Sequence, residues 1–280
     1  MSLRLMLLVL AGAALHAGWN VIVKASAQPS TEVVLVAISA AVFAAMSLPF
    51  LPLPAMACWP YLAASVTVHA LYFTLVGLAY RHSELSYAYP LMRGAAPLFT
   101  AIVASVVVQE PLGIGGWLSI SLLSCGVLTL GADSLRSGRF SWQATGFGLL
   151  NAAVIVSYTM VDGLGVRLSG NPVSYVQWMF FLNALPLVAL YGLRGRIYLL
   201  GNLRSRWKMS ALGGLCAIGS YGVALWAMSR APLALVAALR ESSVLFGTVF
   251  AAVLLKERFG FARYAASALV AAGAIAMKVF

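Results

Sequence analysis

Long apolar stretches separated by short polar connections run along the whole chain. Each stretch has about 20 residues, the length of α-helix that crosses the hydrocarbon core of a bilayer. The pattern predicts about ten transmembrane helices. They cover residues 4–24, 32–52, 59–80, 84–108, 112–132, 143–163, 172–193, 208–229, 231–255 and 259–279. The expected fold is therefore an all-α integral membrane protein with no soluble domain.

Composition supports this prediction. Hydrophobic residues make up 62% of the chain and charged residues 9%, with a mean hydropathy of +0.95. In soluble proteins, about 45–50% of residues are apolar and about 25% are charged. The net charge of +11 comes from Lys and Arg in short gaps between apolar stretches, which argues against nucleic-acid binding. Cys58, Cys125 and Cys216 lie in or beside apolar stretches without metal or redox spacing, so no metal and no cofactor is expected.

The chain contains an internal repeat at an offset of about 147 positions. The offset places Arg93 on Arg240, Leu98-Phe99 on Leu245-Phe246, Glu110 on Glu257, Gly113 on Gly260 and Gly126 on Gly273. Each predicted repeat has an odd number of helices, so the second copy enters the membrane from the opposite side. The expected domains are residues 1–137 and 138–280, as two inverted five-helix repeats. Such repeats are typical of secondary transporters, whose substrate site lies near the midplane.

Three segments resemble a known family. They are LHAGWNVIVKAS (15–26), AYRHSELSYAYPLMRGAAPLF (79–99) and APLALVAALRESSVLFGTVFAAVLLKERFG (231–260). With these segments the chain resembles the drug/metabolite transporter superfamily, and within it the ten-helix EamA-type carriers. The resemblance implies a central cavity between two halves, alternating access and, in many members, export. Members carry amino acids, sugar phosphates, drugs, choline-like cations or lipid-linked sugars, so the family does not define the substrate.

Charge distribution predicts the orientation. Lys and Arg gather in the connections after the odd-numbered spans, above all in residues 194–208. The positive-inside rule places these connections in the cytoplasm and both termini outside. The family resemblance implies the opposite, with both termini inside. We follow the charge count and expect both termini outside. The expected location is a bacterial cytoplasmic (inner) membrane.

Arg93 and Arg240 are the first candidate substrate-binding residues. A charge inside a membrane helix costs at least about 2.5–3.5 kcal/mol on insertion scales and therefore marks a site or a structural ion pair. Pro97 leaves the carbonyl of Arg93 without its helical donor. The two arginines favour an anionic group, such as a carboxylate or phosphate, which a guanidinium binds bidentately. Glu241 either faces Arg93 across the repeat interface or acts as the proton-coupling acid.

Polar and aromatic side chains on three helices extend this candidate site. On the first helix, His16 and Asn20 share one face with Trp19 close by, and Lys24 continues the face toward the headgroups. His69 and Tyr72 follow on the third helix, and Tyr89 lies one turn before Arg93. The competing interpretations are helix–helix hydrogen bonds and an interfacial aromatic belt. Weaker second-half counterparts are Asn151, Tyr158, Gln177, Asn183 and Pro186.

The other acidic residues are interpreted as structural. Glu110 and Glu257 begin the fifth helix of each repeat, where a carboxylate is stabilised by the helix dipole. Both are therefore predicted to cap those helices. Asp162 lies near the predicted end of the sixth helix, which favours a loop role over a place at the cavity mouth.

The leading hypothesis is a secondary exporter of a small organic anion or zwitterion, exchanging for protons by alternating access. Nothing fits the Walker A pattern, so ATP does not drive transport through this chain directly. Alternatives are a flippase for a lipid-linked phosphate, a membrane-embedded enzyme, and a channel or scaffold. An enzyme is disfavoured because the chain has three His in total and no clustered acids. The expected partners are the lipid bilayer and a small-molecule substrate, and small-residue spacings such as Gly12-x-x-x-His16 leave a homodimer open.

Overall fold

The computed structural model describes residues 1–82, 85–136, 142–194, 196–255 and 261–279. Within these ranges the chain contains helices and no strand, so the predicted all-α fold is confirmed. The helices are α1 (Leu3–Lys24), α2 (Pro29–Ser47), α3 (Trp59–His82), α4 (Leu85–Val107), α5 (Ile114–Arg136), α6 (Trp142–Leu168), α7 (Pro172–Arg194), α8 (Arg196–Met228), α9 (Leu233–Arg240), α10 (Ser243–Leu255) and α11 (Phe261–Val279). Two 3-10 turns, η1 (Leu48–Phe50) and η2 (Met56–Cys58), connect α2 to α3.

Most helices begin and end within a few residues of the predicted bounds, with three exceptions. The eighth helix begins at Arg196, well before the expected residue 208, because the basic segment is itself helical. The sixth continues to Leu168, past the expected residue 163. The ninth is divided at Glu241-Ser242 into α9 and α10. Five of the helices in the described ranges are long and apolar enough to cross a membrane, and three shorter segments are also apolar.

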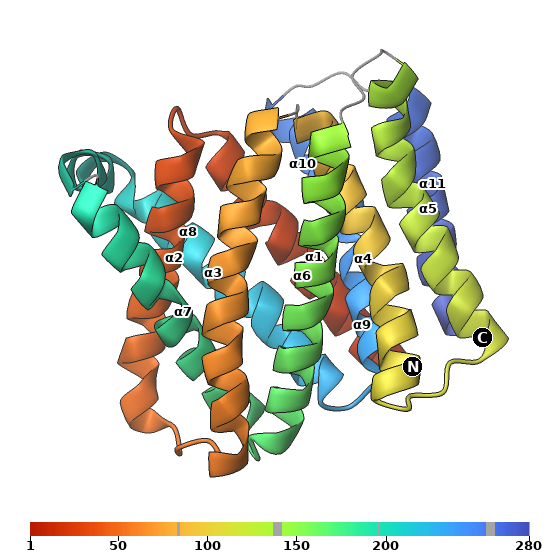
Figure 1. Cartoon of the computed structure of the whole chain (residues 1–280), viewed down its shortest axis with the longest axis horizontal. Helices are drawn as coiled ribbons and strands as arrows, with labels where there is room; N and C mark the ends of the chain where they lie inside the picture. Colours follow the sequence, from red (N-terminus) through yellow and green to blue (C-terminus); the bar gives the residue numbers. More distant parts are fainter. Residues whose placement is uncertain (83–84, 137–141, 195, 256–260, 280) are drawn as a thin grey trace.

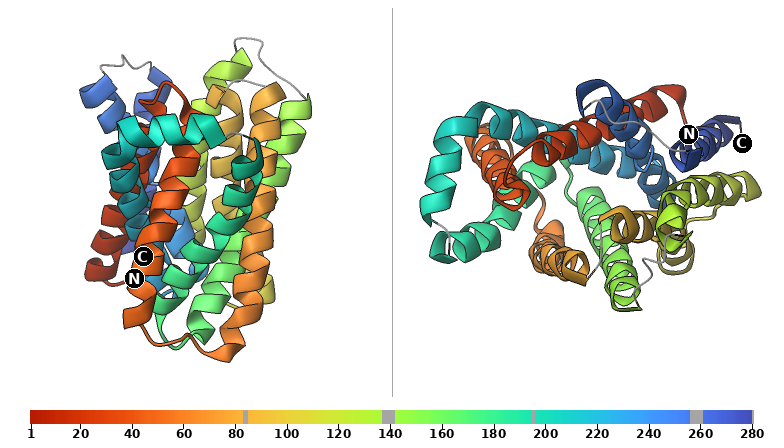
Figure 2. Two further views of the ribbon diagram at one scale, coloured as in Figure 1. Left: turned by 90° about the vertical axis from the view of Figure 1, so that its left-hand side faces the viewer. Right: turned by 90° about the horizontal axis from the view of Figure 1, so that it is seen from above.

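The long helices lie side by side in a single bundle (Figures 1 and 2). The edge helices α5 and α11 pack against each other, while α2, α7 and α8 form the opposite side (Figure 1). Both termini lie toward the same end of the bundle. Because α4 and α6 pack together and α9 contacts α4 and α1, the two halves of the chain meet around α9.

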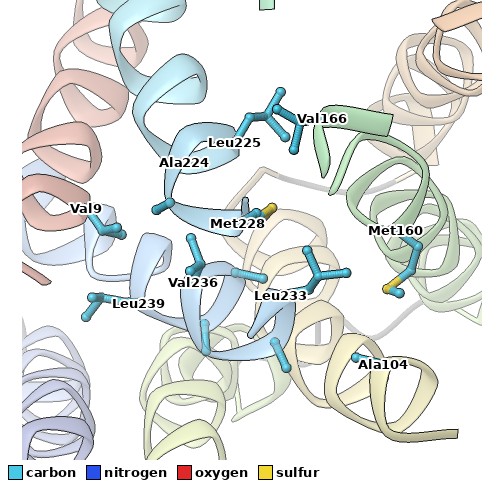
Figure 3. Packing of buried hydrophobic residues seen from close by; sticks show 14 of the residues in the cluster. Val9, Ala104, Met160, Val166, Ala224, Leu225, Met228, Leu233, Val236 and Leu239 are labelled. Carbon is cyan, nitrogen blue, oxygen red and sulfur yellow. The ribbon is translucent and has the colours of Figure 1, made fainter. Parts of the chain in front are cut away.

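The short helix α9 lies at the centre of the bundle. Almost all of its residues are buried, which explains why its sequence is apolar on every side. Leu233, Val236 and Leu239 point into a cluster that includes Val9 of α1, Met160 of α6 and side chains of α4 and α8 (Figure 3). Packing on all sides holds the end of α9, and therefore Arg240, in a fixed place.

A close crossing of α5 and α11 depends on two glycines. A Cβ on Gly126 would lie 2.9 Å from the backbone nitrogen of Val270, and a Cβ on Gly273 would lie 2.9 Å from that of Leu123. Small residues of this kind let membrane helices approach at backbone distance. The contact is symmetric, because the partners exchange places under the same offset of about 147 that relates the two halves of the sequence.

Enlarging this contact is expected to destabilise the protein. Gly126→Val should cost about 1–3 kcal/mol, as overpacking does elsewhere, because its side chain meets backbone atoms that have little room to move. The measurement is the midpoint of thermal unfolding in detergent, followed by tryptophan fluorescence. Gly146→Val in α6 is the matched control, since a Cβ there meets nothing within 4 Å. Equal midpoints for the two variants would contradict the expectation.

Candidate functional site

The break between α9 and α10 positions the charged side chains of the site. Helix α9 ends at Arg240, Glu241 is its C-cap, and α10 begins at Ser243. The amides of Glu241 and Ser242 donate to the carbonyls of Ala238 and Leu239, in the tighter pattern of a 3-10 turn. Such hydrogen bonds satisfy the backbone where the helix is interrupted, which the membrane interior requires. The turn presents two consecutive charged residues to the inside of the bundle.

Arg93 of α4 and Glu241 form a buried ion pair across the two halves of the chain. The Nε of Arg93 donates to Oε2 of Glu241 at 3.0 Å, and its Nη2 lies 3.0 Å from Oε1. Both side chains are only 5% exposed. Of the two roles considered for Glu241, the structure places it in contact with Arg93. The bidentate geometry balances both charges.

Arg240 differs from Arg93 in its contacts. The residue is 7% exposed, and its guanidinium lies over the ring of Tyr221 at 4.9 Å from the centroid. In the part of the chain that the structure describes, its Nε has no hydrogen-bond partner. A buried donor without a partner is costly and points to a group that is bound at some stage of function.

A small cavity lies between these charged residues. Its walls include Arg93, Pro97, Tyr158, Arg240 and Glu241, from α4, α6 and the α9–α10 break. Its volume of about 10 Å³ has room for about one water molecule. The described side chains therefore leave little free space beside the two arginines.

Aromatic rings form one side of the site. His69 of α3 stacks on Tyr158 of α6 at 4.7 Å, and Tyr72 meets the same ring edge-on at 5.8 Å. Tyr158 also lies 6.2 Å from Tyr221, the ring beneath Arg240. Two of the residues predicted from the third helix thus lie in one cluster with the arginine. Nδ1 of His69 lies 3.0 Å from the carbonyl oxygen of Ser65 in the same helix.

Asp162 was wrongly interpreted as a loop residue. It lies inside α6, is fully buried, and accepts hydrogen bonds from the hydroxyls of Tyr175 (3.1 Å) and Tyr221 (2.8 Å). The error arose because α6 continues to Leu168, beyond its predicted end. An acid in the middle of an apolar helix was the sequence signal that could have identified it.

The polar residues of α1 are joined by local bonds. The indole of Trp19 donates to Nδ1 of His16 at 3.3 Å, and the amide of Asn20 donates to the carbonyl of His16 at 2.7 Å. His16 lies within electrostatic range of both Arg93 and Arg240, so α1 faces the same site. Lys24 is the last residue of α1, as expected for an interfacial residue. Tyr89 lies in α4, but its side chain is outside the described ones, and so is Glu257.

Comparison with known proteins identifies the family. Residues 143–278 match the model of the EamA-like transporter family. Residues 143–278 therefore belong to the EamA-like transporter family. The resemblance to the drug/metabolite transporter superfamily is thereby confirmed, and the protein is a multi-pass membrane transporter.

The fold of this EamA-like transporter also occurs in a solved structure. A crystal structure described only as that of a protein is 18% identical, with a TM-score of 0.74. The alignment covers 99% of this chain and 97% of that one, so the same fold extends over the whole length. A search of curated proteins found no match.

The EamA-like transporter has a second ion pair beside the start of α9. Glu110 was predicted to cap α5, but its Oε2 accepts from the backbone nitrogen of Leu233 at 2.8 Å and thus caps α9. Its Oε1 lies 2.6 Å from Nη2 of Arg167. Arg167 also donates to the carbonyls of Met228 (2.8 Å) and Ala231 (2.9 Å). One guanidinium therefore joins the ends of α6 and α8 to the connection before α5.

A third ion pair lies toward the opposite end of the bundle. Glu32 of α2 is buried and accepts from Nε of Arg206 (2.6 Å) and from the hydroxyl of Ser210 (2.8 Å), both in α8. Sequence analysis treated Arg206 only as a loop charge. The lengthening of α8 turns that charge into part of a helix–helix contact.

Proposed function

We propose that this transporter is a secondary carrier that exports a small organic anion or zwitterion by alternating access, coupled to protons. The observation that carries the proposal is Arg240. Its guanidinium is buried at the wall of the central cavity, and its Nε has no hydrogen-bond partner in the described ranges. An anionic substrate group would supply both the missing acceptor and the missing negative charge.

The ion pair of Arg93 narrows the substrate class. Because Glu241 carries one negative charge beside Arg93 and Arg240, the three side chains leave the site one net positive charge rather than two. That arrangement suits a carboxylate with a single negative charge better than a phosphate dianion. The rings of His69, Tyr158 and Tyr221 provide an apolar wall for the rest of the molecule.

We further propose that residues 1–137 and 138–280 are the inverted repeats that exchange access. The symmetric contact of Gly126 and Gly273 supports this division, since related positions of the two halves meet each other. The Arg93–Glu241 pair supports it too, because it crosses between the halves at the cavity. We place the carrier in a bacterial inner membrane with both termini outside, following the positive-inside rule. Its partners are then the bilayer and the substrate, with a homodimer as a further expectation.

Ligand binding to purified protein tests the substrate proposal. A panel of amino acids, organic acids, phosphorylated metabolites and quaternary amines is screened by thermal shift. Carboxylates are expected to stabilise the wild type, and Arg240→Gln should weaken the best of them at least about tenfold, since hydrogen bonds to charged groups are worth about 1.5–3 kcal/mol.

Arg230→Gln is the matched control, because Arg230 is exposed and lies over Trp226 outside the site. It should bind the same ligands as the wild type. Stabilisation by cations alone, unaffected in Arg240→Gln, would overturn the proposal. Stabilisation by lipid-linked phosphates and not by soluble anions would instead indicate the flippase.

A further inference from the structure

Asp162 is a buried acid with an unusual set of partners. No part of it is exposed, and it lies in a helix that crosses the membrane. In the described ranges it makes no ion pair, whereas the buried acids Glu32 and Glu241 each contact an arginine. Its two oxygens accept from the phenols of Tyr175 and Tyr221 instead. A carboxylate held by neutral donors in an apolar interior is costly in its charged form.

The surroundings allow the side chain to exist both with and without a proton. As a carboxylate, Asp162 accepts from both phenols. As a carboxylic acid, it gains one donor, and a phenol hydroxyl can turn to accept it. The hydroxyl of Ser65 is a further hydrogen-bond partner of the carboxyl group, so neutral side chains can meet either state. A residue that is satisfied in both states can change its charge without unfolding its environment.

Charged and titratable groups face Asp162 from several helices. His69 of α3 lies within electrostatic range, and Tyr175 and Tyr221 come from α7 and α8. The guanidinium of Arg240, from α9, lies over the ring of Tyr221. The charge that α4 contributes, Arg93, is balanced by Glu241. Cys58 of η2 and Tyr61 of α3 lie within electrostatic range of Tyr175.

We propose that Asp162, rather than Glu241, binds and releases the proton in the transport cycle, and that Tyr221 links it to the substrate site. This inference rests on the proposed function. The hydroxyl of Tyr221 donates to Asp162 at 2.8 Å, and the guanidinium of Arg240 lies over the ring of Tyr221 at 4.9 Å from its centroid. Glu241 is less suited, because both of its oxygens contact the guanidinium of Arg93 at 3.0 Å, so a proton there would break the ion pair between the two halves.

The charge of the bound substrate determines whether it favours binding or release of the proton by Asp162. An anion bound to Arg240 cancels the positive charge nearest Tyr221, so it favours the protonated form of Asp162. A substrate ammonium group near the same ring favours release of the proton. Proton exchange during export therefore requires a zwitterion or a cationic group on the substrate, whereas a simple anion would move together with the proton.

Infrared difference spectroscopy of the purified transporter tests the inference without any substrate. Acidification is expected to produce the carbonyl band of a protonated carboxylic acid, and alkaline pH should remove it. Because the chain has seven acidic residues, the band of Asp162 is identified by difference: it should be missing in Asp162→Asn and present in Glu241→Gln. Tyr221→Phe should shift its frequency, because one hydrogen bond to the acid is lost.

Two outcomes would overturn the inference. The titrating band could disappear in Glu241→Gln and persist in Asp162→Asn, or the band of Asp162 could stay unchanged over the whole pH range in which the protein is folded. If Asp162→Asn does not fold, the frequency shift of the carboxylic acid band in Tyr221→Phe tests the inference, and an unshifted band would overturn it. The result is independent of ligand binding at Arg240, so failure of the substrate proposal and failure of this one are distinguishable.

Discussion

Glu241→Ala is expected to destabilise the transporter by about 3–5 kcal/mol, the cost of removing one partner of a buried ion pair. The guanidinium of Arg93 would then stay 5% exposed without the carboxylate that balances its charge. Little water can replace that carboxylate, because the cavity beside it has room for about one molecule. The measurement is the midpoint of thermal unfolding in detergent, supported by the yield of monodisperse protein.

A double variant separates charge from packing. Arg93→Met with Glu241→Leu removes both charges and keeps apolar volume, so it should recover most of the lost stability. Arg93→Met alone should be nearly as unstable as Glu241→Ala. If the double variant is as unstable as the two single variants combined, the side chains contribute independently and the ion pair is not what holds this part of the bundle.

The second large effect is expected at Arg167. Arg167→Ala removes the partner of Glu110 and the donor to the carbonyls of Met228 and Ala231, for an expected cost of about 2–3 kcal/mol. The start of α9 should loosen first, because Glu110 also caps it. Thermal unfolding measures the total loss, and hydrogen exchange at the amides of Leu233 and its neighbours locates it.

Glu110→Gln and Glu110→Ala resolve the two roles of that carboxylate. The glutamine oxygen still accepts from the nitrogen of Leu233, so this variant should lose only the ion pair. The alanine variant should also lose the cap, which is worth about 1 kcal/mol. Arg230→Ala, an exposed arginine in the same connection, is the control. Equal stability of Arg167→Ala and Arg230→Ala would show that the contacts of Arg167 contribute little.

Hydropathy predicted the helices well because a membrane span has a nearly fixed length and its ends coincide with polar or proline residues. It missed the start of α8, because the segment beginning at Arg196 is basic yet still helix-forming. It also missed the break at Glu241-Ser242. The residues there are polar but include no proline or glycine, and the break is a tertiary feature stabilised by contacts with α4.

The sequence of each single helix was enough to predict which residues belong to the candidate site, but not which of them contact each other. A charge in a span marks Arg93, Arg240 and Glu241, but their pairing depends on how distant helices meet. Glu110 illustrates the limit. Its position suggested a cap for the next helix, whereas the chain turns at Gln109, where φ is +58°, and the carboxylate reaches a helix more than a hundred residues away.

The small size of the central cavity has a consequence for measured affinity. A space for about one water molecule does not hold an organic substrate, so binding must draw on conformations in which the walls around Arg240 have separated. The apparent dissociation constant is then the intrinsic one divided by the fraction of molecules that are open. Substitutions far from the site that favour the open form should strengthen apparent binding without touching the ligand, and a weak constant for the wild type would not by itself mean a poorly matched substrate.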